Sequence, residues 1–354
     1  MKRVFFVFFM VILAAVVVSA CISGAPPANQ SSPTPRNTMV PALTTVRVAY
    51  SPTTANAPLY IAKDEGYFAR QGIDVELISF PSSTAALPGL ANGDIAVSGG
   101  ALTSGLYNAI AHGAHVRIVA DKGRLGSPGY CNATALMVRK DLFGNGTVRS
   151  IADLRGRKIM AINDQEYSIS NALSMGNLTM DNVEIVKMDY PSGLVALQNG
   201  AVDAGFLTEP YITESLDRGA AVVLSPGTAY YQDFPLPLYY GPALLDKDPD
   251  LGRRFMVAYL QGVKQYNEGK TERNLEILGN YTHLDHNLLQ ESCWLPVAEN
   301  GTLPHKPVMD YMAWLYAGGT IPRQLNDDEI FDMSYVSYAT SVLQNATSVV
   351  NSTT

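Results

Sequence analysis

The sequence is poor in charged residues, cysteine and histidine, and these shortages exclude several classes of function. Lysine, arginine, aspartate and glutamate make up only 16% of the 354 residues, and the net charge is −7. A nucleic-acid-binding protein needs a basic stripe, so this charge balance argues against nucleic acid as a partner. The sequence also has no block of like charges and no acidic low-complexity tail.

Motifs that would indicate an enzyme or a metal site are missing as well. We find no G-x-S-x-G elbow with a following histidine, no G-x-x-x-x-G-K-[ST] phosphate loop and no intact dinucleotide fingerprint. His112 and His115 flank the end of a predicted helix, and His283 and His286 form an H-x-x-H pair without further ligands at metal-site spacing. The expectation is therefore a protein that is not an enzyme and that holds no cofactor and no metal.

The first 21 residues have the pattern of an export signal. Lys2-Arg3 precede an uninterrupted apolar run from Val4 to Val18, and small residues then lead to Cys21. This pattern resembles a lipoprotein signal, in which Cys21 is lipidated and becomes the first mature residue. The alternative is an uncleaved transmembrane anchor from Phe5 to Ala20. Both interpretations place the folded part outside the cytoplasm, anchored to the outer face of the cell membrane.

Residues 22–45 are rich in proline, serine, alanine and asparagine and predict a flexible tether. Besides Cys21 the chain has only Cys131 and Cys293, which we expect to pair in an oxidising compartment, the alternative being two buried free thiols. Eight N-x-S/T sequons fit an exported glycoprotein, although an Asn- and Thr-rich chain also produces sequons by chance. They begin at Asn29, Asn132, Asn145, Asn177, Asn280, Asn300, Asn345 and Asn351.

The stretch from Val46 to Phe80 predicts a βαβ unit, around which the rest of the chain is organised. An alternating run, Val46 to Tyr50, is followed by a small polar loop, a helix with Pro58 in its first turn, and a second strand, Asp74 to Phe80. In open α/β sheets ligands bind where strand carboxyl ends meet helix starts. The loop there contains Ser51, Thr53 and Asn56, so we expect these three residues to contact a ligand.

The same stretch, APLYIAKDEGYFARQGIDVEL, is similar to the substrate-binding proteins of ABC transporters for nitrate, sulfonates, taurine and thiamine precursors. The similarity continues through GLANGDIAVSGG, VRIVADKG, IADLRGRKIMAI and ALQNGAVDAGFLTEPYITESL, and covers Val46 to Leu224. It implies an α/β fold of the periplasmic-binding-protein type II, with two doubly wound lobes joined by a double hinge and extra C-terminal helices. We expect lobe 1 over residues 46–135 and 236–345, lobe 2 over residues 136–235, and a disordered tail at 346–354.

The resemblance implies a monomeric receptor that captures a small anion, such as a sulfonate, a taurine-like compound or nitrate. It would close its lobes over the ligand and present it to an ABC permease. Two alternatives stay open. In the first alternative, the chain is the ligand-sensing ectodomain of a signalling system. The lack of a second membrane segment before Thr354 argues against it. In the second alternative, the protein is a receptor whose ligand is an aromatic carboxylate or a thiamine-type pyrimidine.

Several residues are candidates for the walls of this binding site. Ser98-Gly99-Gly100 end a predicted strand and start a helix from Ala101 to His112, whose free amides would bind an anion, unless this is only a tight, ordinarily capped turn. Glu209 either pairs with an amine of the ligand or caps the helix from Pro210 to Asp217. The remaining candidates are Tyr60, Asp121, Asn163, Tyr167 and Tyr211.

Three further residues have two interpretations each. Lys122 and Arg124 follow a strand predicted from Val116 to Ala120, and either supply positive charge to an anion or are solvated surface charges. Tyr130 either forms an aromatic wall of the site or packs at the hinge.

Overall fold

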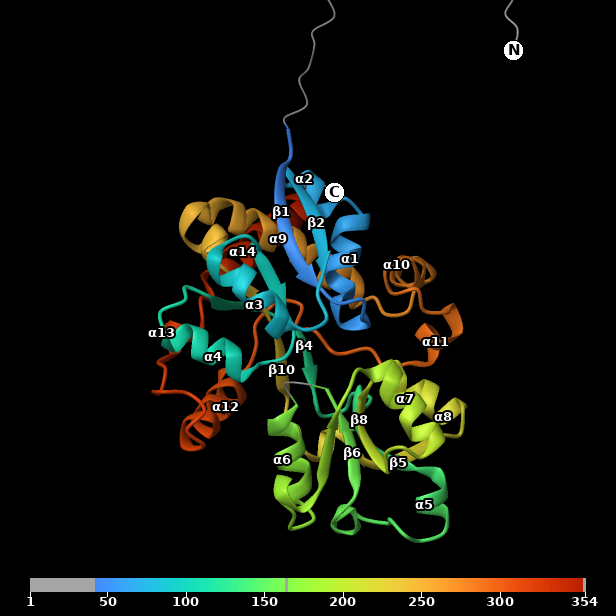
Figure 1. Cartoon of the computed structure of the whole chain (residues 1–354). Helices are drawn as coiled ribbons and strands as arrows, with labels where there is room; N and C mark the ends of the chain where they lie inside the picture. Colours follow the sequence, from blue (N-terminus) through green and yellow to red (C-terminus); the bar gives the residue numbers. More distant parts are fainter. Residues whose placement is uncertain (1–41, 163–164, 353–354) are drawn as a thin grey trace, which may run out of the picture. The chain divides into compact units, whose positions relative to one another are not determined.

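The computed structural model describes residues 42–162 and 165–352, which contain two five-stranded sheets (Figure 1). Sheet A has the strand order β2-β1-β3-β10-β4, with β1 Thr44–Tyr50, β2 Ile73–Ser79, β3 Val97–Gly99, β4 Arg117–Leu125 and β10 Phe234–Tyr240. Sheet B has the order β7-β6-β8-β5-β9, with β5 Thr134–Arg139, β6 Lys158–Ala161, β7 Glu184–Lys187, β8 Ala204–Thr208 and β9 Ala221–Pro226.

The helices fall into two groups, one for each sheet (Figure 1). Those around sheet A are α1 Ala57–Asp64, α2 Tyr67–Arg70, α3 Ser83–Asn92, α4 Ser104–Ala111, α9 Pro249–Tyr266, α10 Glu272–Thr282, α11 His286–Glu291, α12 His305–Ala317, α13 Asp327–Ile330 and α14 Ser334–Ser352. Those around sheet B are α5 Lys140–Gly144, α6 Glu166–Ser174, α7 Tyr190–Asn199 and α8 Tyr211–Asp217. We call sheet A with its helices lobe 1 and sheet B with its helices lobe 2.

Short helical turns complete the secondary structure. They are η1 Thr54–Asn56, η2 Ile151–Leu154, η3 Met180–Asn182, η4 Gly227–Ala229 and the single π-helical turn η5 Ala243–Lys247. Within the two described ranges no helix has the length and apolarity needed to cross a bilayer. The predicted signal and residues 22–41 of the predicted tether lie outside the described residues. The tether ends earlier than predicted, because β1 already begins at Thr44.

The chain passes between the sheets twice, after β4 and after β9. Each crossing delivers one antiparallel strand to the sheet it enters. β5 pairs antiparallel with both β8 and β9, and β10 pairs antiparallel with both β3 and β4. The other strands are joined through helices on their own lobe and run parallel, as crossover connections allow. This connectivity turns the carboxyl ends of the parallel strands of both sheets to the same region between the lobes.

The two crossings are bonded to each other. Arg124 Nη1 lies 3.1 Å from a carboxylate oxygen of Asp233, and the Ser127 hydroxyl donates to the other oxygen of that carboxylate. Gly126 has φ +70°, and a Cβ there would lie 2.4 Å from the carbonyl oxygen of Tyr231. A side chain at position 126 would therefore push the two crossings apart.

The expected C-terminal helices begin with α9, which packs against α1 and α14. Its apolar residues at helical spacing, Leu251, Phe255, Tyr259, Val263 and Tyr266, are all buried. At Gly262 a Cβ would lie 2.3 Å from the carbonyl oxygen of Pro58 in α1, so the absence of a side chain lets these two helices approach closely.

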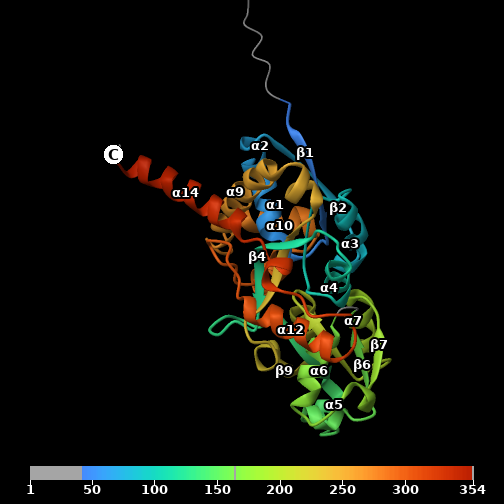
Figure 2. The same cartoon turned by 90° about the vertical axis from the view of Figure 1, so that its left-hand side faces the viewer.

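Besides the earlier start of β1, three elements differ from the sequence-based expectation by more than one residue. Strand β4 continues past Ala120 to Leu125, and α4 begins at Ser104 rather than at Ala101. Residues 346–352, expected as a disordered tail, continue α14, because no glycine or proline ends the helix there. Figure 2 shows this end of α14 pointing away from the rest of lobe 1.

Candidate functional site

A cavity of about 950 Å³ lies between the lobes, where the strand carboxyl ends converge. From lobe 1 it is lined by residues that follow or end β1, β2 and β3, among them Ser51, Phe80 and Gly99. From lobe 2 it is lined by residues at the ends of β6, β7 and β8, among them Ile162 and Thr208. This is the position at which open α/β sheets bind ligands. It is therefore the candidate binding site.

Seven of the twelve candidate ligand residues from the sequence line this cavity, and four do not. Those that line it are Ser51, Thr53, Ser98, Gly99, Gly100, Tyr167 and Glu209. Asn56, Tyr60, Asp121 and Tyr211 are absent from its wall. Asn163 lies outside the described residues. Tyr130, an open alternative, does not line the cavity and is 59% exposed.

Asn56 and Tyr60 are buried and support the loop that follows β1, residues 51–55, which we call the binding loop. The Asn56 Nδ2 donates to the carbonyl oxygen of Ser51 at 2.7 Å, and the Tyr60 hydroxyl donates to the same oxygen at 2.9 Å. The Tyr60 ring stacks on Tyr281 at 4.6 Å, and burial raises the pKa of its hydroxyl. Both side chains fix where Ser51 lies, and neither reaches the cavity.

Asp121 is a structural residue in this protein. Its carboxylate is fully buried and accepts hydrogen bonds from the backbone N–H of Gly123 at 3.1 Å and of Ala298 at 2.8 Å, with Arg124 Nε at 3.4 Å. Burial raises the pKa of Asp121, and these hydrogen bonds and Arg124 oppose that rise. The carboxylate thus joins β4 to the segment after α11, and we leave it out of the proposed site.

The neighbouring residue Lys122 lines the cavity, although the sequence left open whether it is a surface charge. Successive residues of a strand point to opposite sides, so extending β4 past Ala120 turns Lys122 away from the Asp121 side. Its side chain is 2% exposed, and Nζ donates to the carbonyl oxygen of Ala55 at 3.0 Å. Among the described residues no carboxylate lies within 4.0 Å of Nζ, and burial lowers the pKa of Lys122 to about 8.

Gly99 provides the space for this lysine. A Cβ at Gly99 would lie 2.9 Å from Cδ and 3.0 Å from Cε of Lys122. The expected helix N-terminus at Gly99 to Ala101 is not present, because α4 begins later, after the N-cap Thr103, whose side chain accepts from the Leu106 N–H at 3.1 Å. The N–H of Gly100 donates to the carbonyl oxygen of Pro237 at 3.1 Å.

The carboxylate of Glu209 is held by the fold on the lobe 2 side of the cavity. One oxygen accepts from the N–H of Thr213 at 3.1 Å, the other accepts from the N–H of Cys293 at 3.3 Å, and the Thr213 hydroxyl reaches both. Burial raises the pKa of Glu209, and the bonds from Thr213 oppose the rise. Of the two interpretations of Glu209, the structure therefore shows the bond to the first turn of α8.

The other charged groups of the cavity are compensated. Lys187 lies at 2.6 Å from Glu166 and also donates to the Ile162 carbonyl oxygen at 3.1 Å. Asp189 is the N-cap of α7, where it accepts from the N–H of Ser192 at 2.8 Å. Of the two lysines that line the cavity, Lys187 contacts a carboxylate, whereas Lys122 contacts none among the described residues.

The remaining candidates shape the wall of the cavity or lie elsewhere. The Tyr211 ring stacks on Tyr190 at 5.2 Å, and Tyr190 lines the cavity, so Tyr211 supports the wall from behind. Cys131 and Cys293 form a disulfide with Cα atoms 5.7 Å apart, and Cys293 also lines the cavity. In the described part of the chain no three histidine, cysteine, aspartate or glutamate side chains cluster as metal ligands would.

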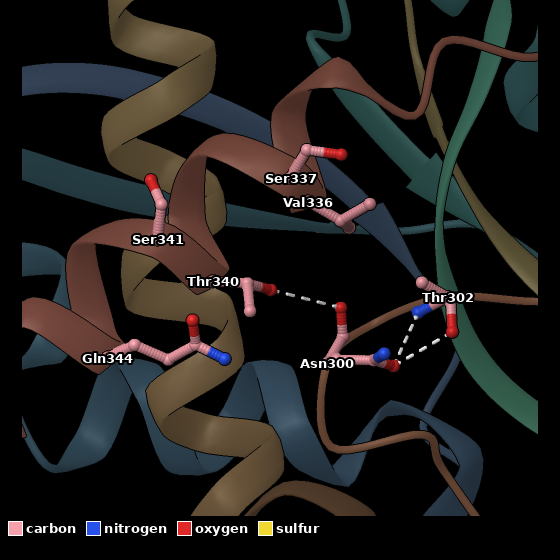
Figure 3. A pocket seen from close by; sticks show the side chains of 7 residues that line it. All are labelled: Asn300, Thr302, Val336, Ser337, Thr340, Ser341 and Gln344. Atoms are coloured by element: carbon pink, nitrogen blue, oxygen red, sulfur yellow. Dashed lines mark hydrogen bonds between the residues drawn. The ribbon is translucent and has the colours of Figure 1, made fainter.

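A second, smaller hollow of about 240 Å³ lies between α14 and the turn at residues 300–302. Figure 3 shows Thr340 on α14 facing Asn300, to whose carbonyl oxygen its hydroxyl donates at 3.4 Å. The Asn300 Oδ1 accepts from the N–H and the hydroxyl of Thr302. Hydroxyl and amide side chains line most of this hollow, which contains no charged group. It is a weaker candidate for binding a ligand.

Comparison with known proteins identifies the family. The family described as NMT1/THI5 like matches residues 53–269, well over half of the chain. The chain belongs to this family. The match includes the binding loop from Thr53 onward, β3, Lys122 and all of lobe 2, and therefore most of the cavity lining. The predicted kinship with ABC-transporter substrate-binding proteins for nitrate, sulfonates, taurine and thiamine precursors is thereby confirmed.

Individual relatives extend the comparison. The taurine-binding periplasmic protein of Escherichia coli (strain K12) is 28% identical over 200 residues, which are 53% of this chain and 58% of that protein. The periplasmic nitrate-binding protein NrtA from Synechocystis PCC 6803 matches with a TM-score of 0.69 at 15% identity, over 86% of this chain and 90% of that one. The desulfurization enzyme DSZB matches with a TM-score of 0.63 at 13% identity, over 84% and 99%. This member of the NMT1/THI5-like family thus has the periplasmic-binding-protein type II fold, which binding proteins and an enzyme share.

Proposed function

We propose that this protein is the extracytoplasmic solute receptor of an ABC importer and that it captures a small anion in the cavity between its lobes. The relatives named for taurine and nitrate support an anionic ligand, since taurine carries a sulfonate and nitrate is itself an anion. The charge of Lys122 carries the proposal. A buried ammonium without a contacting carboxylate is unfavourable by itself, and an anionic ligand would compensate it.

Ser51, Thr53 and Ser98 complete the proposed head-group site. Their hydroxyls are neutral donors that line the same cavity as Lys122 from the ends of β1 and β3. Closure of the lobes would exclude water and strengthen each of these interactions. The partners in this proposal are the transmembrane subunits of a permease and the membrane itself, reached through a lipid on Cys21 and the tether. The receptor acts as a monomer.

Thermal unfolding of the purified full-length protein tests this proposal. Nitrate, taurine, methanesulfonate and benzoate would be added in turn. A ligand at about 100 times its dissociation constant adds about 2.7 kcal/mol to the free energy of unfolding, which is easily measured. We expect at least one anion to raise the unfolding temperature and to be recovered chemically unchanged, as a receptor requires.

The Lys122→Met variant is the matched control. It keeps the unbranched stem of the side chain and removes the charge. We expect it to fold and to show no anion-dependent shift. If no anion stabilises the wild type, or if the variant responds as strongly as the wild type, the proposal is wrong. Conversion of the bound anion would show an enzyme instead.

A further inference from the structure

We infer that the anion carries one charged head and a sizeable apolar body, such as an aromatic ring system, and that this body lies against a wall of aromatic side chains in the cavity. This inference rests on the proposed function and specifies the class of its ligand. It follows from the charge pattern, the lining and the volume of the cavity.

The charge pattern indicates one anionic group and no cationic one. Lys122 is the cavity cation without a contacting carboxylate among the described residues, whereas Lys187 is paired with Glu166. A ligand with an ammonium group would need a carboxylate that is available to it. Glu209 already accepts hydrogen bonds at both oxygens, and Asp189 caps α7. The balance of these contacts favours a monoanion over a zwitterion.

The aromatic wall is formed by Tyr167, Phe234 and Tyr311, all of which line the cavity. The Tyr167 ring centroid lies 4.8 Å from that of Tyr311 and 5.7 Å from that of Phe234, and the last two are 6.1 Å apart. The three rings come from α6, β10 and α12, so lobe 2 and lobe 1 both contribute to the wall. The rings are inclined to one another by 32° to 67° and pack as one apolar cluster, whose edges and faces suit contact with a further aromatic ring.

The rest of the lining extends this apolar surface. Phe80, Leu125, Tyr231, Leu236 and Leu295 also line the cavity. A nitrate ion or a methanesulfonate held at Lys122 would leave most of this surface in contact with water. The volume of about 950 Å³ falls in the range of cavities that bury ligands much larger than either anion. An apolar body would displace that water, and its burial would add to the affinity of the head group.

Isothermal titration of the full-length protein with a graded series of sulfonates tests this inference. The probes are methanesulfonate, taurine, benzenesulfonate and naphthalene-2-sulfonate, which share one head group. Among the three probes that lack an amine, we expect the dissociation constant to fall from methanesulfonate to benzenesulfonate to naphthalene-2-sulfonate. Naphthalene-2-sulfonate should bind at least about tenfold tighter than methanesulfonate. Taurine should bind no tighter than methanesulfonate, because the cavity carboxylates of the described residues, Glu166, Asp189 and Glu209, already have partners within the protein.

Two tyrosine variants show whether the wall is responsible. Tyr167→Leu removes a ring from the wall, and Tyr316→Leu removes a 44% exposed ring from α12 outside the cavity. We expect Tyr167→Leu to weaken naphthalene-2-sulfonate severalfold more than it weakens methanesulfonate. Tyr316→Leu should change neither ligand, and Tyr167→Phe, which keeps the ring, should retain most of the preference.

The possible results separate this inference from the function it rests on. Equal affinities along the series, or a preference for taurine or methanesulfonate, would overturn the inference and leave an anion receptor standing. Binding of naphthalene-2-sulfonate that survives both Lys122→Met and Tyr167→Leu would place the ligand elsewhere and overturn it as well. Failure of every sulfonate, of benzoate and of nitrate would overturn the proposed function too.

Discussion

Lys122 is the residue at which stability and the proposed function oppose each other. The side chain is buried and has the Ala55 carbonyl oxygen as its hydrogen-bond partner, while the carboxylate of Asp121 is bonded elsewhere. Burial lowers its pKa from 10.5 to about 8, which corresponds to an unfavourable contribution of roughly 3 kcal/mol at neutral pH. A residue kept at such a cost in the ligand-free protein is consistent with a binding role.

We therefore expect Lys122→Met to make the ligand-free protein more stable. The folded-state pKa lies below that of the unfolded chain, so the unfolded chain holds more protons between about pH 8 and 10.5. The unfavourable contribution is present in full below about pH 8 and is lost as the pH rises toward 10.5. The gain of the variant should be about 1–3 kcal/mol at pH 7, less than the full value because the bond to Ala55 is lost, and should shrink above pH 8.

Urea unfolding of both proteins at pH 7, 8, 9 and 10 measures this difference. Asp121, Arg124 and the hydroxyl of Tyr259 lie around the same part of β4, and all of them are unchanged in the variant, so their titration largely cancels in the comparison. A variant that is less stable than the wild type at pH 7, or a gain that grows above pH 8, would contradict the assignment of the lowered pKa to Lys122.

At the scale of elements, Gly99 at the end of β3 leaves the space that the side chain of Lys122 on β4 occupies. Gly99 pairs with Leu238 of β10, and a Cβ added to it would meet the lysine stem and, at 3.2 Å, Leu238 Cδ1. A methyl group inserted between packed side chains forces them to move and typically costs about 1–3 kcal/mol. We expect Gly99→Ala to fold, to lose stability in this range, and to bind anions at least about tenfold more weakly, as titration would show.

Gly144→Ala is the matched control for this substitution. Gly144 ends α5, and a Cβ there would meet no atom within 4 Å. The control should keep both stability and affinity. Unchanged anion affinity in Gly99→Ala would show that the position of Lys122 does not depend on this glycine.

The sequence predicts which strands surround the cavity better than it predicts where those strands end. The wrong end of β4 explains why Asp121, and not Lys122, was predicted to contact the ligand. The strand-end rule placed Ser51, Ser98 and Glu209 at one site, and all three line the cavity, the first two from lobe 1 and Glu209 from lobe 2. It stopped β4 at Ala120, because Asp121-Lys122-Gly123 has the composition of a turn. In the structure β10 pairs beside these residues as far as Leu125, a contact between segments more than a hundred residues apart that no local pattern encodes. With the strand extended, alternation assigns Asp121 to the interior and Lys122 to the cavity.

At the scale of the whole molecule, the two crossings between the sheets are the parts that any closure must bend. They are joined by Arg124 and Asp233 and by the close approach of Gly126 to Tyr231. The disulfide makes a different connection, between the first crossing, which contains Cys131, and the segment of lobe 1 between α11 and α12, which contains Cys293. The region around the crossings is therefore tied to lobe 1 covalently as well as by packing.

Removing this disulfide should lower stability more than it lowers affinity. The bridge joins residues 162 positions apart, for which the chain-entropy model gives about 5 kcal/mol. We expect the double variant Cys131→Ser/Cys293→Ser to lose about 3–5 kcal/mol and to unfold roughly 10 °C lower than the wild type. Anion affinity should fall by less than about threefold, because the charge and packing of Lys122 are untouched. A reductant should lower the unfolding temperature of the wild type to that of the double variant and should have no effect on the variant. Equal stability of the wild type and the double variant would show that packing and the bonds between the crossings hold this region together without the disulfide.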